Sequence, residues 1–200
     1  MPRVLYVLES LGMGGTEQSV LEIAGRLRAQ GTVEPVVAYL TSPSPLASRY
    51  RAAGIQTIPL ALHHPYRFAQ GVERLLRLMR AQRPDLIHTA TFAANVAGRT
   101  AGRLAQIPVV SSVVGDTYAA VYREKKTPLA RAKHQVVQAL DRSTARWVRR
   151  FAANSHALAA STVRDLGVGA DRIEVIHRGR DPELFVPGDA SMARVRLGAR

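Results

Sequence analysis

The sequence predicts an α/β fold: a doubly wound, mostly parallel sheet of about seven strands with helices on both faces. Short apolar runs of β-forming residues alternate along the chain with segments whose apolar residues recur at helical spacing. Hydrophobic residues make up 46% of the 200 residues, which is enough to build a core. The chain has no cysteine, so disulfides, zinc-thiolate sites and thiol nucleophiles are excluded.

The first unit of the chain is predicted to be a strand, a glycine loop and a helix. Residues 3–8 form an apolar run, residues 12–15 are rich in glycine, and a helical pattern from Thr16 ends at Gly31. Acidic residues lie early in this helix and arginines lie late, as the helix dipole favours.

The same alternation of strand and helix continues to residue 177. Residues 65–82 place apolar side chains on one helical face and arginines on the other, and the valine-rich run at 108–114 is typical of a strand buried on both faces. The further predicted strands are 33–40, 55–60, 85–88, 108–114, 151–154 and 173–177, and the further predicted helices are a short one ending at Ala53, then 65–82, 92–104, 128–150 and 156–166.

The charge balance points to an anionic partner. Lys and Arg number 28 against 15 Asp and Glu, a formal net charge of +13, and most of the basic residues are arginine. Genome composition is one explanation; a membrane surface, a polyanionic substrate or nucleic acid are the functional ones. We expect no nucleic acid, because no helix-turn-helix, RNA-binding aromatic motif or zinc-ligand set is present. We also expect no export signal and no membrane span, since no apolar run approaches about 20 residues.

The first glycine loop is a candidate anion site. In a doubly wound sheet, ligands bind at the carboxyl ends of the strands, and Gly14, Gly15 and Thr16 follow the first strand and open a helix. Glu17 stands where the third glycine of a dinucleotide-binding fingerprint belongs, and no P-loop motif occurs. Two interpretations stay open, namely an anion contact and a tight turn.

Polar residues at the end of the fourth strand and after the fifth are further candidates. His88 is either a ligand contact or general base, or a half-buried histidine with its hydrogen bonds satisfied. Asp116, Tyr118 and Tyr122 either contact a sugar or an anion or belong to a solvated loop. His63 and His64 have no third ligand at a suitable spacing, so we expect no metal site.

Residues 123–150 carry nine basic and two acidic residues. A solvated helix face is one interpretation, and a surface that docks on anionic lipid is the other. The stripe of apolar residues predicted here comprises Leu129, Val136, Leu140 and Trp147. The membrane-surface candidates to one side of it are Arg131, Arg142, Arg146 and Arg149.

Several blocks resemble retaining GT-B glycosyltransferases of the family 4 type, specifically their N-terminal, acceptor-binding domain. The resemblance rests on Gly14-Gly15-Thr16-Glu17, Pro84-Asp85-Leu86-Ile87-His88, residues 108–115, Ala153-Asn154-Ser155, residues 173–177, Arg178-Gly179-Arg180-Asp181 and Phe185-Val186-Pro187. The chain departs from the family pattern at Ala90, at Val114-Gly115 and at Arg178, where histidine, His-Gly and asparagine are commoner.

The resemblance implies a Rossmann-like domain over residues 1–184, one half of a GT-B fold, and a linker over 185–200 that begins a C-terminal domain. The nucleotide-sugar donor would bind mainly to that second domain, with no metal and no covalent cofactor, so the isolated chain is expected to be inactive. The implied acceptor is a glycan or a lipid-linked sugar. The implied protein is a cytoplasmic monomer, peripheral at the inner face of the cell membrane; a non-catalytic membrane-docking or binding module on the same fold is the alternative.

The resemblance also distributes roles among the candidate residues. Gly14, Gly15 and Thr16 would meet the donor's phosphate or sugar. No catalytic residue is assigned beyond the candidate His88. The acceptor-binding candidates are His88, Thr91, Asn95, Asp116, Tyr118, Tyr122 and Arg178.

Overall fold

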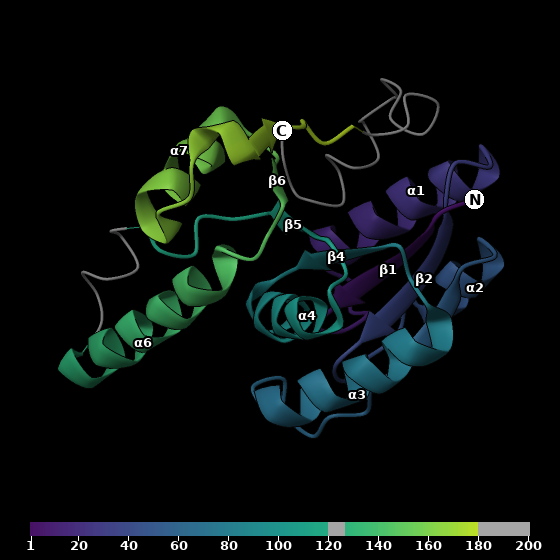
Figure 1. The fold of residues 1–200 in the computed structure, drawn as a ribbon, viewed down its shortest axis with the longest axis horizontal. Helices are drawn as coiled ribbons and strands as arrows, with labels where there is room; N and C mark the ends of the chain where they lie inside the picture. Colours follow the sequence, from purple (N-terminus) through teal and green to yellow (C-terminus); the bar gives the residue numbers. More distant parts are fainter. Residues whose placement is uncertain (120–126, 180–200) are drawn as a thin grey trace, which may run out of the picture.

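The computed structural model describes residues 1–119 and 127–179 and confirms the predicted fold class. Seven parallel strands form one sheet in the order β3-β2-β1-β4-β5-β6-β7 (Figure 1). The strands are β1 Arg3–Leu8, β2 Glu34–Tyr39, β3 Gln56–Pro59, β4 Leu86–Ala90, β5 Val109–Val113, β6 Arg150–Ala153 and β7 Ile173–Val175. The helices are α1 Gly15–Ala29, α2 Ala47–Ala52, α3 Phe68–Gln82, α4 Phe92–Ala105, α6 Pro128–Ala145 and α7 His156–Leu166, with a 3₁₀ turn at Ala170–Arg172.

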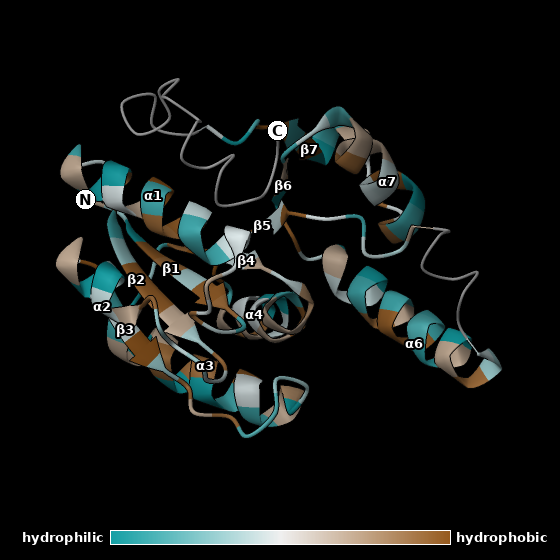
Figure 2. Cartoon of the chain, turned by 180° about the vertical axis from the view of Figure 1, so that it is seen from behind, coloured by the Kyte–Doolittle hydropathy of each residue, from teal (hydrophilic) through white to brown (hydrophobic). Residues whose placement is uncertain are grey.

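The two faces of the sheet are covered by different helices. On one face α1 and α2 pack on alternate residues of β1 and β2, among them Tyr6 and Val37. On the other face α3 and α4 pack on the intervening residues, among them Leu5 and Val36 (Figure 1). Apolar residues accordingly concentrate on the strands and on the helix sides that face them (Figure 2). A third, smaller cluster around Phe151 lies under α6 and α7.

The strand order reverses between β1 and β4. From β1 the chain moves outward to β2 and β3, then returns to place β4 on the other side of β1. The loops that leave β1 and β4 therefore diverge to opposite faces, and the gap between them is where doubly wound sheets bind ligands. This switch point positions the site described below.

Several predicted bounds differ from the observed ones. The helix predicted over 65–82 begins at Phe68, and the strand predicted at 85–88 continues to Ala90, so His88 lies within β4 and not at its end. The helix predicted over 128–150 ends at Ala145, and the strand predicted at 151–154 begins at Arg150. Val148 turns into the core under α6 and α7, and the Arg149 amide donates a hydrogen bond to the Val109 carbonyl at 2.7 Å, which aligns the chain with β5. Pairing with the sheet thus overrides a helical apolar pattern.

Candidate functional site

Two pockets lie at the carboxyl ends of β4 and β5, one beside α1 and one beside α4. We name them the α1 pocket, of about 260 Å³, and the α4 pocket, of about 210 Å³. Ser112, Val113 and Val114, at the end of β5, line both. β5 is therefore a wall that the two pockets share.

The glycine loop leads into Thr16, which lines the α1 pocket. Gly14 is the N-cap of α1 in an extended conformation, and no side chain caps the helix there. A Cβ placed on Gly15 would meet nothing closer than Arg178 Nη1 at 3.6 Å. The Arg178 guanidinium donates to the Gly15 carbonyl at 3.4 Å, so a positive charge lies beside the helix N-terminus. The helix N-terminus and Arg178 attract an anion at this position, whereas the Glu17 carboxylate, which lies against Gly14, opposes one.

His88 forms an inner wall of the α1 pocket. Its Nε2 lies 2.7 Å from the Ser112 hydroxyl, and its ring centroid lies 5.1 Å from that of Tyr6. Burial lowers the pKa of His88 to about 4, because the surroundings disfavour the imidazolium ion. The side chain is therefore neutral at pH 7. Whether its other ring nitrogen, Nδ1, carries the proton depends on whether Nε2 donates to the Ser112 hydroxyl or accepts from it.

The loop after β1 adds an acidic group near the same edge. Burial raises the pKa of the Glu9 carboxyl, the nearby charge of Glu17 raises it further, and His64 partly offsets both. Glu9 comes directly after β1, and His64 comes from the segment between β3 and α3.

The α4 pocket begins at a strained residue. Thr91, the N-cap of α4, has φ 74° and ψ 155°, a backbone conformation that residues other than glycine rarely adopt. Its hydroxyl oxygen and Asn95 Oδ1 are buried with no hydrogen-bond partner among the described residues. Both residues line the pocket. A strained backbone and two buried polar atoms without partners, side by side at a helix N-terminus, are typical of a ligand site.

A buried polar network holds the far wall of the α4 pocket. Arg99 Nη1 donates to Asp141 Oδ1 at 2.6 Å, and the Tyr118 hydroxyl donates to Asp141 Oδ2 at 2.8 Å. Arg99 Nε donates to the Ser111 hydroxyl of β5 at 3.0 Å, and the guanidinium lies 5.6 Å from the Phe151 ring centroid. The network joins α4, α6, β5 and the loop after β5, so Tyr118 is fixed against the pocket by residues of three elements.

The structure separates the acceptor candidates into two sets. Thr91, Asn95, Asp116 and Tyr118 line the α4 pocket. His88 and Arg178 line the α1 pocket together with Thr16, on the other side of the β5 wall. Tyr122, like the linker at 185–200, lies outside the described residues.

Sequence reasoning missed several residues of the two pockets. Asn154 of the α1 pocket was quoted only as part of the family resemblance, with no role in the site, and Phe92, Arg99 and Asp141 of the α4 pocket were not singled out. Two of them left a signal: Asp141 is an acid in a strongly basic segment, and Arg99 is a lone charge in the Ala- and Gly-rich first three turns of α4. A charge that opposes the character of its own segment indicates a specific partner.

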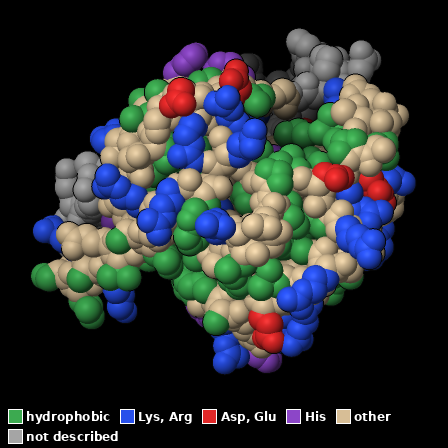
Figure 3. Space-filling view, viewed as in Figure 1, with side chains coloured by type: hydrophobic (Ala, Val, Ile, Leu, Met, Phe, Trp, Pro, Cys, Tyr) green, Lys and Arg blue, Asp and Glu red, His purple; other side chains and the backbone are tan. Residues whose placement is uncertain are grey.

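The basic candidates near α6 are exposed. Arg131 and Arg142 lie on α6, Arg146 is at its C-cap with its guanidinium 5.3 Å from the Trp147 ring centroid, and Arg149 follows. Figure 3 shows Lys and Arg side chains gathered with few acidic ones over the C-terminal end of α6 and over α7. On α6 itself, Leu129 and Val136 of the predicted apolar stripe are each 68% exposed. Within the described ranges, no helix has the length and apolar character needed to cross a membrane.

Comparison with known proteins defines the class. Anabaena Alr3699/HepE, solved in complex with UDP and glucose, superposes with a TM-score of 0.75 at 22% identity over 99% of this chain and 50% of that one. A glycosyltransferase from Rickettsia africae ESF-5 superposes with a TM-score of 0.66 at 14% identity over 100% of this chain and 50% of that one. The fold is thus the Rossmann-like fold of one half of a GT-B glycosyltransferase.

Sequence comparison gives the family. The model of Glycosyltransferase Family 4 matches residues 13–184, and the chain belongs to this family. A D-inositol 3-phosphate glycosyltransferase from Nocardioides sp. (strain ATCC BAA-499 / JS614) is 28% identical over 92% of this chain. The chain spans 43% of the length of that relative.

Proposed function

We propose that this chain is the acceptor-binding half of a retaining glycosyltransferase that moves a sugar from a nucleotide-sugar donor to a glycan or lipid-linked acceptor. The observation that supports this most directly is the pair of pockets on either side of the β5 wall. Family membership supports sugar transfer, and the structural relatives that are twice as long support a second domain that holds most of the donor.

The α1 pocket suits the donor. Its helix N-terminus and Arg178 favour a phosphate or a polar sugar edge, and the related Anabaena protein was solved with UDP and glucose. The donor would reach this pocket from the second domain, so Gly15 and Thr16 contact its phosphate or sugar. His88, neutral at pH 7, acts there as a hydrogen-bonding group and not as a cation.

The α4 pocket suits the acceptor. Asn95 Oδ1 accepts a hydrogen bond from a ligand hydroxyl, and the Thr91 hydroxyl donates or accepts one, which would satisfy both buried atoms. Asp116 and Tyr118 add further polar groups to the lining. Hydroxyl-rich ligands such as sugars meet these demands.

The proposal is tested on the chain alone and on the complete protein that contains it. With UDP-glucose as the first donor probe and an array of glycans as acceptors, the complete protein transfers sugar and residues 1–200 alone do not. Residues 1–200 that turned over the donor at the same rate as the complete protein would overturn the two-domain proposal. Complete protein that transferred no sugar from any of a panel of nucleotide sugars would overturn the proposed activity.

We further propose that the α6 surface docks on anionic lipid. Leu129 and Val136 lie two helical turns apart and expose their side chains on one face of α6. Arg131 and Arg142 lie on another face of the helix, and with Arg146 and Arg149 they attract lipid headgroups by about 1 kcal/mol each near a membrane. Charge attraction by these arginines gives reversible binding.

The docking proposal predicts sedimentation of the chain with vesicles that contain anionic phospholipid, and none with phosphatidylcholine vesicles. Binding fades at 1 M salt, where the Debye length is about 3 Å. Most of this binding is expected to be lost when glutamine replaces four arginines together: Arg131, Arg142, Arg146 and Arg149. A matched control replaces four exposed arginines of the α2 and α3 region: Arg49, Arg51, Arg80 and Arg83. Equal binding by both variants would place the contact elsewhere, and no sedimentation of the wild-type chain would overturn the proposal.

A further inference from the structure

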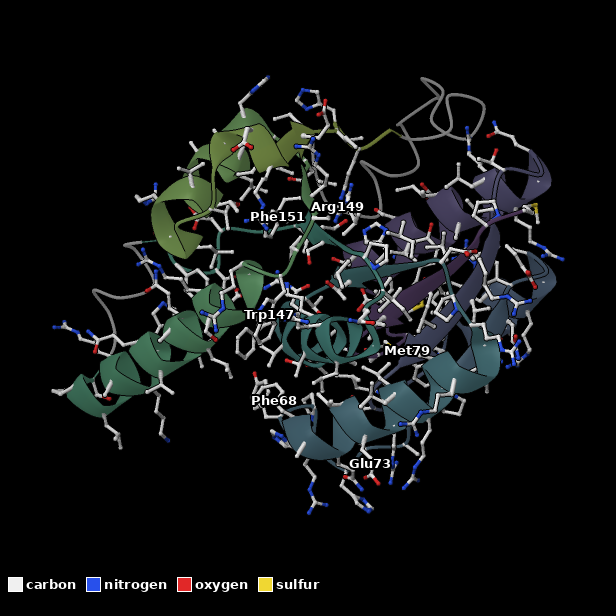
Figure 4. All side chains as sticks on the ribbon, viewed as in Figure 1. Phe68, Glu73, Met79, Trp147, Arg149 and Phe151 are labelled. Atoms are coloured by element: carbon white, nitrogen blue, oxygen red, sulfur yellow. The ribbon has the colours of Figure 1, made fainter. Side chains whose placement is uncertain are left out.

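Four aromatic rings from separate segments gather beside the α4 pocket. His64 and Tyr66 come from the segment between β3 and α3, Phe68 is the first residue of α3, and Phe92 is the first residue of α4. Tyr66 lies at the centre of the group, with its ring centroid 5.1 Å from His64, 5.9 Å from Phe68 and 6.0 Å from Phe92. Figure 4 shows Phe68 at the start of α3, on the side toward α4.

The Tyr66 ring is both held and exposed. Its three ring neighbours restrict its movement, while Phe68 and Phe92 also contact each other edge to face at 6.1 Å. Phe68 in turn packs on the core under α3 and α4, which anchors the group to the sheet. Tyr66 nevertheless remains 54% exposed. Because the exposed ring is already ordered, a ligand that stacks on it does not have to immobilise the side chain, and the entropic cost of binding is smaller.

The aromatic group is continuous with the α4 pocket. Phe92 belongs to the group and also lines the pocket, directly after Thr91 and three residues before Asn95. The two buried oxygens without partners in the described part of the chain, on Thr91 and Asn95, and the exposed Tyr66 ring therefore lie on either side of Phe92. A sugar chain has the same two characters: hydroxyls around each ring edge and a face of C–H groups, which the negative face of an aromatic ring attracts.

We infer that the exposed ring of Tyr66, which Phe92 supports edge to face, forms a stacking platform for a sugar ring of the acceptor, next to the ring whose hydroxyls the α4 pocket binds. The inference rests on the proposed acceptor role of that pocket and narrows it. The preferred acceptor carries at least two linked sugar rings, one in the pocket and one on the platform. A single small polyol would leave the platform empty.

The test measures glycan binding by the chain itself. Residues 1–200 are applied to an array of mono- and oligosaccharides, and the dissociation constant of the best ligand is then measured in solution. Tyr66→Ala, which removes the ring, raises Kd about tenfold, equivalent to 1.4 kcal/mol. Tyr66→Phe, which keeps the ring, and Leu104→Ala, which removes an exposed side chain from the distant end of α4, leave Kd within about twofold. Circular dichroism verifies that each variant is folded.

The outcomes separate the platform from the acceptor role. If Asn95→Ala weakens glycan binding and Tyr66→Ala does not, the platform is overturned and the acceptor role stands. If monosaccharides bind as tightly as oligosaccharides, the two-ring preference is overturned. Tyr66-dependent binding of UMP in place of glycans would assign the ring to a nucleobase and overturn the platform. A wild-type chain that binds no arrayed glycan overturns both proposals.

Discussion

The Arg99–Asp141 ion pair is expected to contribute strongly to stability because it is buried. The two side chains are 2% and 9% exposed, and their nearest nitrogen and oxygen lie 2.6 Å apart. Burial lowers the pKa of the Arg99 guanidinium and Asp141 raises it, so the carboxylate keeps this charge tolerable. Asp141→Ala leaves a buried guanidinium without a carboxylate and the Tyr118 hydroxyl without its acceptor. We expect the free energy of unfolding to fall by about 3–5 kcal/mol.

Urea unfolding monitored by circular dichroism measures this loss. The matched control is Glu73→Ala, which breaks the Arg77–Glu73 pair of α3, whose side chains are 69% and 58% exposed. A pair at this spacing on a solvated helix contributes about 0.3–0.5 kcal/mol, so the two variants differ several-fold. A loss for Asp141→Ala as small as that for Glu73→Ala would refute the reasoning, because it would mean that water reaches the guanidinium.

Three further predictions concern the two pockets. Gly15→Val leaves the unfolding curve unchanged, since Arg178 at 3.6 Å is the nearest atom to an added Cβ, yet abolishes sugar transfer by the complete protein; equal rates would reduce the loop to a turn. Stability falls between about pH 6.5 and 4 by up to about 1.4 kcal/mol per pH unit, because the unfolded chain protonates His88 before the folded chain does, and His88→Gln removes this part of the urea-unfolding pH profile. Thr91→Gly raises Tm in a thermal melt, since strain of about 1–3 kcal/mol is relieved and glycine adopts this conformation freely; a lower Tm would contradict the strain.

The elements with strong local signals could be predicted from the sequence. The helix His156–Leu166 matches its prediction at both ends, because Ser155 caps its N-terminus through Leu158 N and Gly167 takes the left-handed conformation after its last turn. The end of α6 could not be predicted in this way. Nothing local stops that helix at Ala145, and the stop follows from pairing of Arg149 and Arg150 with β5, about 40 residues away in sequence.

The site could be predicted in location but not in arrangement. Ligands bind at the carboxyl ends of the strands in any doubly wound sheet, and this rule alone selects His88, Thr91 and Asp116. It does not say on which side of the β5 wall each side chain lies, since that depends on how the chain turns after β4. The pairing of Arg99 with Asp141 joins residues 42 positions apart, and neither residue has a local pattern that specifies the other.

The two edges of the sheet differ in a way that supports function at only one of them. At the amino edge, Arg3 is fully engaged: its guanidinium binds Glu34 and the Gln82 carbonyl, and its amide binds Asp85. At the carboxyl edge of β4, Thr91 is strained and two buried oxygens lack partners among the described residues. These features lower stability, and core packing gives the chain no reason to place them at the carboxyl edge of β4. A ligand hydroxyl that donates a hydrogen bond to Asn95 Oδ1 would supply the missing partner. The free energy that the unliganded protein loses at this oxygen would then be regained on binding.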